Sequence, residues 1–442
     1  MSSDNRLGTI GPRQGRIAKS QERLSSGQEP IANSQRRLCI IGSGPAGCYV
    51  AEHLLKLLPD ARIDVLEKLP VPFGLIRYGV APDHQSTKGA ARVLDRTLSR
   101  ERVRFFGNVE VGRDVTLSEL RAMYHVVVLA TGAQRDRKLG IPGEDLPGVI
   151  GSGAFVGWYN GHPSRNTPHL SDVSSAVVIG NGNVALDVAR ILAKGADELK
   201  GSDSPPDVIE ALRSQPVRDI HIVGRRGAAE AKFNEHELEE LGTLLRAKPV
   251  VEDDAHLAGE TPVQKVLRQF ADDPRTALPV TIHFHFGLTP AAFTGSPHLE
   301  SVTFRSAGGE VTIPAQLAVT CIGYEAVPCC TASPANGVFT NDGGKIDDGL
   351  YVAGWAKRGP SGTIPTNRSE AQQVAQRIAN DLAGAAEKPA NDLAEVLRSR
   401  GVMWIDYTGW KRIEAMERAA AGDERCLLKL LQTEEMLRAA NG

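Results

Sequence analysis

The sequence lacks any long apolar run and carries almost no net charge. None of its apolar runs approaches the roughly 18 residues that a membrane-spanning helix needs, and no apolar signal core stands near its beginning. Lys and Arg total 51 and Asp and Glu total 53, which gives a formal net charge of −2. Because nucleic-acid-binding proteins are usually strongly basic, we expect neither a nucleic acid nor a membrane as partner.

The chain also has few cysteines. There are six, and none is spaced as C-x-x-C, which excludes a disulfide scaffold and a zinc module as the basis of the fold. The adjacent pair Cys329-Cys330 is too close for an ordinary structural disulfide. We therefore expect reduced thiols, no metal site and a cytoplasmic protein.

Glycine, by contrast, is abundant, with 45 among the 442 residues. A chain of this length predicts two or three domains, at roughly 150 residues each. Residues 1–36 are polar and rich in Ser, Gln and Arg. Such a segment buries too little apolar area to offset its ordering entropy, so we expect a flexible polar tail.

The first glycine cluster lies inside a strand–helix–strand unit. An apolar strand at 38–41 is followed by Gly42-Ser43-Gly44-Pro45-Ala46-Gly47, a helix at about 45–57 and a second strand at 63–67. The three glycines of this GxGxxG pattern allow a tight turn, close approach of a pyrophosphate and close packing of helix on strand. Glu67 ends the second strand, where a carboxylate binds a ribose diol, so this unit predicts an adenine-dinucleotide site.

A second unit of the same kind begins near residue 176. The strand 176–179 leads into Gly180-Asn181-Gly182-Asn183-Val184-Ala185, a helix over 183–194 and a strand at 220–223. The latter strand is followed by Arg225 and Arg226 rather than by an acid. A guanidinium pair binds a 2′-phosphate, whereas a carboxylate repels it, so the second unit predicts NADP(H).

Two dinucleotide sites in one chain indicate electron transfer between two cofactors, usually FAD in the first site and NADPH in the second. Further strands are expected at 124–132 and 350–355, and shorter ones over 281–325. The glycine-rich loop 354–364 lets backbone N–H groups reach a flavin ring. The start of the helix 365–380 favours negative charge there.

Several long strings resemble the adrenodoxin reductase-type ferredoxin–NADP(+) reductases. In chain order these strings are 71–84 (VPFGLIRYGVAPDH), 106–112 (FGNVEVG), 141–148 (IPGEDLPG), 155–160 (FVGWYN), 180–190 and 355–362. The resemblance as a whole covers about residues 37 to 385. The resemblance implies FAD bound near Ala46, Glu67, Leu75, Val111, Trp355 and Gly362, Thr363 and Ile364. It implies NADPH bound by Asn181, Gly182, Asn183, Val184, Arg225, Arg226 and Glu237.

His84 and Glu237 are the candidate catalytic residues at the junction of the nicotinamide and flavin rings. An imidazole and a carboxylate there could orient the carboxamide and manage the flavin proton. From the residues alone, His84 is equally well a turn residue after Pro82-Asp83. Glu237 is more simply a solvated helix residue, and only the resemblance favours the catalytic role.

The resemblance implies an NADPH:ferredoxin oxidoreductase, which passes a hydride from NADPH to FAD and single electrons to an iron–sulfur partner. A thioredoxin- or glutathione-type disulfide reductase needs a C-x-x-C or C-x4-C pair, which is absent, and a glutamate synthase subunit needs N-terminal cysteine clusters. Both are excluded. A non-enzymatic flavoprotein scaffold is disfavoured by the two intact fingerprints. An NADPH-dependent reductase of a small-molecule acceptor or a dedicated monooxygenase system stays open as the alternative.

Lys88, Arg92, Arg96 and Arg100 recur every four residues and predict a basic stripe on one helix face. Such a stripe is more simply a solvated face, but it could also dock an acidic ferredoxin.

The expected fold is α/β, with two Rossmann-like three-layer nucleotide-binding domains, a glutathione-reductase-like FAD domain and an inserted NADP domain. The FAD domain comprises 37–135 plus 321–442, with a helical extension from about 391. The NADPH domain comprises 136–320, and the active site is expected in the cleft between them.

Overall fold

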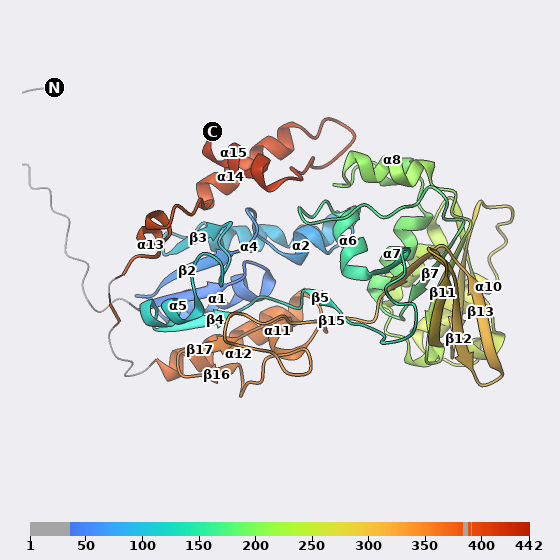
Figure 1. The fold of residues 1–442 in the computed structure, drawn as a ribbon, viewed down its shortest axis with the longest axis horizontal. Coiled ribbons are helices and arrows are strands. Elements are labelled where there is room, and N and C mark those ends of the chain that lie inside the picture. The colour runs from blue at the N-terminus through green and yellow to red at the C-terminus, as the bar shows by residue number, and fades with distance from the viewer. Residues whose placement is uncertain (1–35, 383–387, 390) are drawn as a thin grey trace, which may run out of the picture.

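The structure is a computed structural model, which describes residues 36–382, 388–389 and 391–442 (Figure 1). The polar tail expected at 1–36 therefore lies almost wholly outside the described residues. Two six-stranded sheets organise the rest of the chain, at opposite ends of the view in Figure 1. This confirms the expected α/β class.

The first sheet is built from the first four strands of the chain and the last two. Its order is β16-β17-β4-β1-β2-β3, and every pairing is parallel except that of β16 with β17. Its strands are β1 (Arg37–Ile41), β2 (Arg62–Glu67), β3 (Val103–Gly107), β4 (Val126–Leu129), β16 (Lys345–Asp347) and β17 (Leu350–Val352).

Helices cover both faces of the first sheet because its buried strands alternate apolar side chains between the two faces. Leu38 and Ile40 of β1 pack into one cluster with helices α1, α4, α12, α14 and α15. Cys39 and Ile41 pack into the opposite cluster with α5 and α13. The helices of this part are α1 (Pro45–Leu57), α2 (Leu75–Tyr78), α3 (Gln85–Lys88), α4 (Ala91–Leu98), α5 (Leu117–Met123), α11 (Trp355–Arg358), α12 (Ile364–Asp381), α13 (Leu393–Ser399), α14 (Tyr407–Ala419) and α15 (Thr433–Asn441).

The second sheet is entirely parallel, in the order β6-β14-β7-β8-β10-β9. Its strands are β6 (Val149–Gly151), β7 (Ser175–Ile179), β8 (Asp219–Gly224), β9 (Ala247–Val251), β10 (Val280–Phe286) and β14 (Leu317–Thr320). Helices cover one face, and they are α6 (Ser152–Tyr159), α7 (Asn183–Ala193), α8 (Pro206–Ser214), α9 (Glu235–Glu239) and α10 (Pro262–Ala271), with 3-10 turns η1 (Ala196–Leu199), η2 (Ala228–Glu230), η3 (Glu240–Thr243) and η4 (Asp254–Leu257).

The other face of the second sheet is covered by strands rather than helices. An antiparallel sheet of β11 (Thr289–Gly295), β12 (Leu299–Ser306) and β13 (Gly309–Pro314) packs Phe293, Phe304 and Ile313 against Val177 and Val223. The short strands expected over 281–325 are thus confirmed, and Gly309 begins the last strand of this meander.

The chain leaves the first sheet after β4 and returns to it after β14. On the way out it forms β5 (Arg135–Asp136), and on the way back it forms β15 (Tyr324–Glu325); the two pair as a small antiparallel ladder. The predicted strand 350–355 is shorter than expected. It ends at Val352, because Gly354 has φ +70° and turns the chain into helix α11, which starts at Trp355.

The last part of the chain is helical, as expected from about 391. Trp410 of α14 meets Phe73 edge to face, with ring centroids 5.6 Å apart. We call the residues around the first sheet the first part of the molecule and those around the second sheet the second part. The loop between α14 and α15 forms hydrogen bonds with the second part: Gly201 N donates to Glu424 O at 2.8 Å, and Cys426 N donates to Ser202 O at 3.3 Å. The C-terminal helical segment therefore contacts both the residues around the first sheet and those around the second sheet.

Candidate active site

The first glycine loop is tightly fitted between strand ends. Gly42 has φ +112°, and a Cβ there would stand 2.3 Å from the carbonyl oxygen of Ala130. Gly44 is the N-cap of the 13-residue helix α1 and provides no side-chain cap. The first N–H groups of α1 therefore lack a side-chain acceptor, which suits a phosphate group.

Glu67 lies where a ribose contact was predicted, at the carboxyl end of β2, and its side chain is buried. Its Oε2 accepts hydrogen bonds from the Ser43 backbone N at 3.1 Å and from Ser43 Oγ at 2.7 Å. Its Oε1 accepts one from Leu69 N at 3.2 Å. This carboxylate therefore fixes the glycine loop, and its ribose contact stays a prediction.

Several of the residues implied for FAD meet beside this loop. A Cβ on Gly354 would stand 2.5 Å from Ala46 Cβ, and a Cβ on Gly74 would stand 3.3 Å from Gly44 Cα. These close approaches bring the start of α1 against the loop after β17 and against Gly74, the residue before Leu75. That leucine is 46% exposed, unusual for an apolar side chain in such a cradle.

The other residues implied for FAD lie at neighbouring loops of the same sheet. Val111 lies in the turn after β3. Trp355 Nε1 donates to Ser361 O at 3.2 Å, and its ring stacks on Tyr324 with centroids 6.0 Å apart. Gly362 has φ +80°, Thr363 is the N-cap of the 18-residue helix α12, and Ile364 is its first residue. The residues present fit an apolar ring and a pyrophosphate.

The second glycine loop repeats the first. Gly180 has φ +147°, and a Cβ there would stand 2.3 Å from the carbonyl oxygen of Cys321. Gly182 is the N-cap of the 11-residue helix α7 without a side-chain cap. Asn183 Oδ1 accepts a hydrogen bond from Asn234 N at 2.7 Å, and the next residue, Val184, packs against the helical core.

Asn181 has both polar atoms of its amide buried without a hydrogen-bond partner among the described residues. Buried amide groups are normally paired, so this side chain is suited to a bound polar ligand. It packs against the end of β8, where a Cβ on Gly224 would stand 1.7 Å from its Nδ2. Gly224 thus makes room for Asn181.

Arg225 and Arg226 follow Gly224 directly and are both exposed. Neither guanidinium takes part in a hydrogen bond or ion pair with any residue in the described part of the chain. Their charge is therefore available to a ligand. A 2′-phosphate would fit the residues present.

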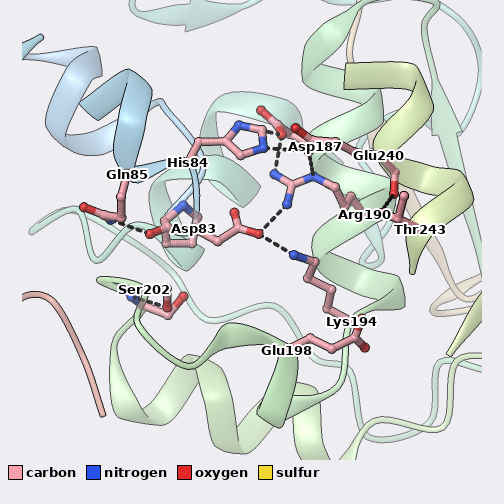
Figure 2. Close-up of polar contacts among 12 residues, drawn as sticks. Asp83, His84, Gln85, Asp187, Arg190, Lys194, Glu198, Ser202, Glu240 and Thr243 are labelled. Carbon is pink, nitrogen blue, oxygen red and sulfur yellow. Dashed lines mark hydrogen bonds and ion pairs between the residues drawn. The ribbon is translucent and has the colours of Figure 1, made fainter. Parts of the chain in front are cut away.

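His84 lies between the two parts of the molecule and bonds a residue that sequence reasoning did not select (Figure 2). Its Nε2 is 2.9 Å from Oε2 of Glu240, and its Nδ1 is 3.7 Å from Oδ1 of Asp187. Burial lowers the pKa of His84. The hydrogen bond to Glu240 and the charges of Asp187 and Asp83 outweigh burial, so the pKa is raised above its ordinary value. Glu240 in turn has a lowered pKa, chiefly through His84.

A buried ion-pair cluster holds the neighbouring backbone. Arg190 of α7 pairs with Asp83, and with Oδ1 of Asp187 at 2.7 Å; Lys194 Nζ lies 2.6 Å from Asp83 Oδ2 (Figure 2). Burial raises the pKa of Asp83, but Arg190 and Lys194 outweigh it and hold that pKa well below its usual range. The segment that carries His84 is thus clamped to α7.

Glu237 belongs to the same neighbourhood but does not bond His84. Its Oε2 is buried and has no partner among the described residues. Burial and the charge of Asp187 raise the pKa of this carboxyl. The structure therefore brings His84 and Glu237 together, while Glu240, three residues further along the chain, makes the direct contact. The spacing of 237 and 240 on one helical turn was the only sequence signal for Glu240.

The predicted basic stripe is wrong at both ends, because Lys88 lies in α3 and Arg100 lies beyond Leu98, where α4 ends. Lys88 is the last residue of α3, it is buried, and its Nζ lies 3.0 Å from Asp203 Oδ2. Gly89 and Ala90 separate α3 from α4, so the four residues do not share one continuous helix. Arg92 and Arg96 are exposed on α4.

Among the described residues, no helix is both long and apolar enough to cross a membrane.

The chain is similar to known proteins along most of its length. The family model described as pyridine nucleotide-disulphide oxidoreductase matches residues 36–376. The human mitochondrial NADPH:adrenodoxin oxidoreductase is 37% identical, over 91% of each chain. The NADPH-ferredoxin reductase FprA of Mycobacterium tuberculosis is 38% identical over 92% of this chain and 99% of its own. The solved structure of FprA in complex with NADPH matches with a TM-score of 0.88, covering 92% of this chain and 100% of that one. The chain therefore belongs to the pyridine nucleotide-disulphide oxidoreductase family, and within it to the group of the adrenodoxin reductase-type ferredoxin reductases.

Proposed function

We propose that this chain is an FAD-containing NADPH:ferredoxin oxidoreductase. One observation carries the proposal: two glycine loops open two uncapped helices, and only the second loop is followed by a free guanidinium pair. A chain with one dinucleotide site would have no use for the second loop. FprA, a relative that is crystallised with NADPH, supports the assignment of NADPH to this chain.

In the second part, the chain's residues bind and select the coenzyme. The N–H groups at the start of α7 receive the pyrophosphate, the Asn181 amide gains partners, and Arg225 and Arg226 bind the 2′-phosphate. Charge-assisted hydrogen bonds of this kind are the strong ones, because at least one partner is ionised. The absence of a carboxylate at the end of β8 removes repulsion from the phosphate.

In the first part, the residues hold FAD by the start of α1, the cradle of Ala46 and Gly354, and the loop at Gly362, Thr363 and Ile364. Val111, Leu75 and Trp355 add apolar cover, and Glu67 keeps the glycine loop in place. When bound, the two cofactors supply a hydride donor and a ring that releases its electrons singly.

The His84 cluster keeps protons and charges fixed where the two parts meet. Hydride transfer needs the donor and acceptor rings stacked within about 3–3.5 Å, which calls for rigid placement of both parts. The clamp of Asp83 by Arg190 and Lys194 supplies that rigidity. His84 and Glu237 orient the carboxamide, and Glu240 holds the imidazole ring in one position.

We assign residues 37–135 plus 321–442 to an FAD domain and residues 136–320 to an inserted NADPH domain. The two passages of the chain at β5 and β15, which pair with each other, support these boundaries. A cytoplasmic location is also part of the proposal. It is supported by the six cysteines, all of which are free thiols.

The acceptor is an iron–sulfur protein in this proposal, because the human and mycobacterial relatives are named for adrenodoxin and ferredoxin. The test is a second mixing step: protein reduced by one equivalent of NADPH is mixed with ferredoxin or with a small quinone. We expect the ferredoxin to be reduced in single-electron steps and faster than the quinone at equal concentration. If the quinone is reduced rapidly and none of several ferredoxins is reduced, the result would instead support the alternative, a reductase of a small-molecule acceptor.

A further inference from the structure

The adjacent cysteines Cys329 and Cys330 occupy a tight turn on the first part of the molecule. Cys329 N donates to Ala332 O at 2.8 Å, and Ala332 N donates back to Cys329 O at 3.0 Å. Cys330 lies at the tip of this turn with φ +53°, a conformation that residues other than glycine adopt rarely. The turn thus sends two consecutive side chains into different surroundings.

The two thiols differ in access but interact with each other. Cys329 is buried, with 7% of its surface exposed, whereas Cys330 is exposed. Burial, and then the charge and hydrogen bonding of Cys330, raise the pKa of the Cys329 thiol to about 12. An accessible sulfur therefore lies beside a protected one, the arrangement in which one cysteine meets an oxidant and its neighbour resolves the product.

We propose that Cys329 and Cys330 form a redox-active dithiol site, which peroxides oxidise to a disulfide between the two adjacent residues. The Cys330 thiolate attacks one peroxide oxygen, the O–O bond breaks, hydroxide leaves and takes up a proton to become water, and a sulfenic acid forms on Cys330. The Cys329 sulfur then attacks that sulfenic sulfur; the S–S bond forms, the S–O bond breaks, and water leaves with the Cys329 proton. Two thiols lose two electrons in total, and hydrogen peroxide is reduced to water.

The disulfide is expected to be easily reduced. Consecutive Cα atoms are about 3.8 Å apart, less than the roughly 4.4–6.8 Å that ordinary disulfides span. The ring is therefore strained, and strained, exposed disulfides have more oxidising potentials and act as labile or regulatory bonds. A cytosolic thiol pool would keep the pair reduced, and a burst of peroxide would close it.

Closure would also be felt beside the proposed FAD site. A Cβ on Gly112 would stand 3.4 Å from Cys330 Sγ, so this sulfur lies against the turn that carries Val111. Drawing Cys330 Sγ towards Cys329 removes it from Gly112. The dithiol chemistry itself does not depend on any bound cofactor or on the proposed function.

The test is mass spectrometry of the full-length protein after brief treatment with hydrogen peroxide in a few-fold excess. We expect a species lighter by two hydrogen atoms, mapped to the peptide that holds both cysteines, and restored by dithiothreitol. In Cys329→Ala, Cys330 should accumulate sulfenic acid that dimedone traps. In Cys330→Ser, the loss of two hydrogens should disappear.

The variant Cys426→Ser is the matched control, because Cys426 is a partly exposed cysteine with no adjacent cysteine, and it should behave as the natural protein does. Trapping of Cys330 by dimedone to the same extent in the natural protein and in Cys329→Ala would overturn the proposal. So would a disulfide that joins Cys330 to a second chain, or peroxide oxidation that leaves Cys330 untouched. The natural protein's own peptide map decides the matter even where a variant folds poorly.

Discussion

Nε2 of His84 lies 2.9 Å from Oε2 of Glu240, although 156 positions separate the two residues in the chain. One residue follows the first glycine-loop unit and the other follows the second. Their contact therefore joins the two parts of the chain that we propose to hold the two cofactors. Because Nδ1 of His84 also lies 3.7 Å from Oδ1 of Asp187, the imidazole ring lies between two carboxylates.

Replacing Glu240 by Gln should lower the pKa of His84. The raised pKa means that the contact stabilises the fold fully below the ordinary value of about 6.5 and loses this effect as pH rises through the folded pKa. Urea unfolding should show that E240Q lowers the free energy of unfolding by about 1 kcal/mol at pH 5.5 and by much less at pH 9.

The matched control for that measurement is Glu239→Gln, an exposed carboxylate one residue earlier, which should change stability little at either pH. NMR titration of the His84 ring, identified by its absence in His84→Asn, reports the pKa directly. An unchanged His84 pKa in E240Q would show that the contact does not hold the proton.

Removing both guanidinium groups should weaken the binding of NADPH far more than the binding of NADH. Hydrogen bonds to charged groups contribute about 1.5–3 kcal/mol each, so the double variant R225A/R226A should raise KM for NADPH at least roughly tenfold. Steady-state kinetics with both coenzymes measures this. Arg218→Ala, at the other end of β8, should leave both KM values unchanged. Equal losses for NADPH and NADH would refute the 2′-phosphate role.

Gly224→Ala should damage the NADPH loop alone. The added Cβ would stand 1.7 Å from Asn181 Nδ2, so the Asn181 side chain must leave its place. We expect the NADPH dissociation constant to rise several-fold in a fluorescence titration, with flavin content unchanged. Gly308→Ala, where the nearest atom lies 3.8 Å from the added Cβ, is the control. Unaltered NADPH affinity in G224A would remove Asn181 from the binding site.

Asp203 should matter more for stability than Lys429. The Nζ atoms of Lys88 and Lys429 each lie 3.0 Å from Asp203 Oδ2, and all three side chains are buried. Asp203→Asn leaves two buried cations without their anion and should cost about 3–5 kcal/mol. Lys429→Met leaves Lys88 and Asp203 as an ion pair with no net charge, so it should lower the free energy of unfolding clearly less.

Urea unfolding of both variants decides between these outcomes, with Asp197→Asn as a control in an exposed pair with Lys200. If the Lys429 variant is the weaker of the two, the extension stabilises the fold by something other than this charge balance.

Most helices and strands of the fold could be predicted from local sequence patterns. The strand at 38–41, the helix at 45–57 and their repeats near 176–193 were predictable because glycine turns and apolar runs act over short distances. The helices α13, α14 and α15 of the last part of the chain are of the same kind. The antiparallel sheet on the second part was foreseen only as short strands, since nothing in a single strand says which face it will cover.

Contacts between distant segments were not predictable in this way. Glu240 looked like one of several acids on a solvated helix, and only folding brings it to His84. The prediction of a basic stripe was wrong for a related reason. The spacing assumed one helix through Lys88 and Arg92, whereas helix α3 ends at Lys88, and that side chain is buried beside Asp203. Burial of a charge depends on its partners, which lie far away in sequence.

Anaerobic stopped-flow absorbance of the purified protein, mixed with NADPH or NADH, measures whether a bound flavin accepts electrons from NADPH. We expect a yellow protein whose flavin absorbance bleaches rapidly with NADPH and much more slowly with an equal concentration of NADH. A colourless protein that takes up no FAD, or a flavin that NADPH does not bleach, would contradict this expectation.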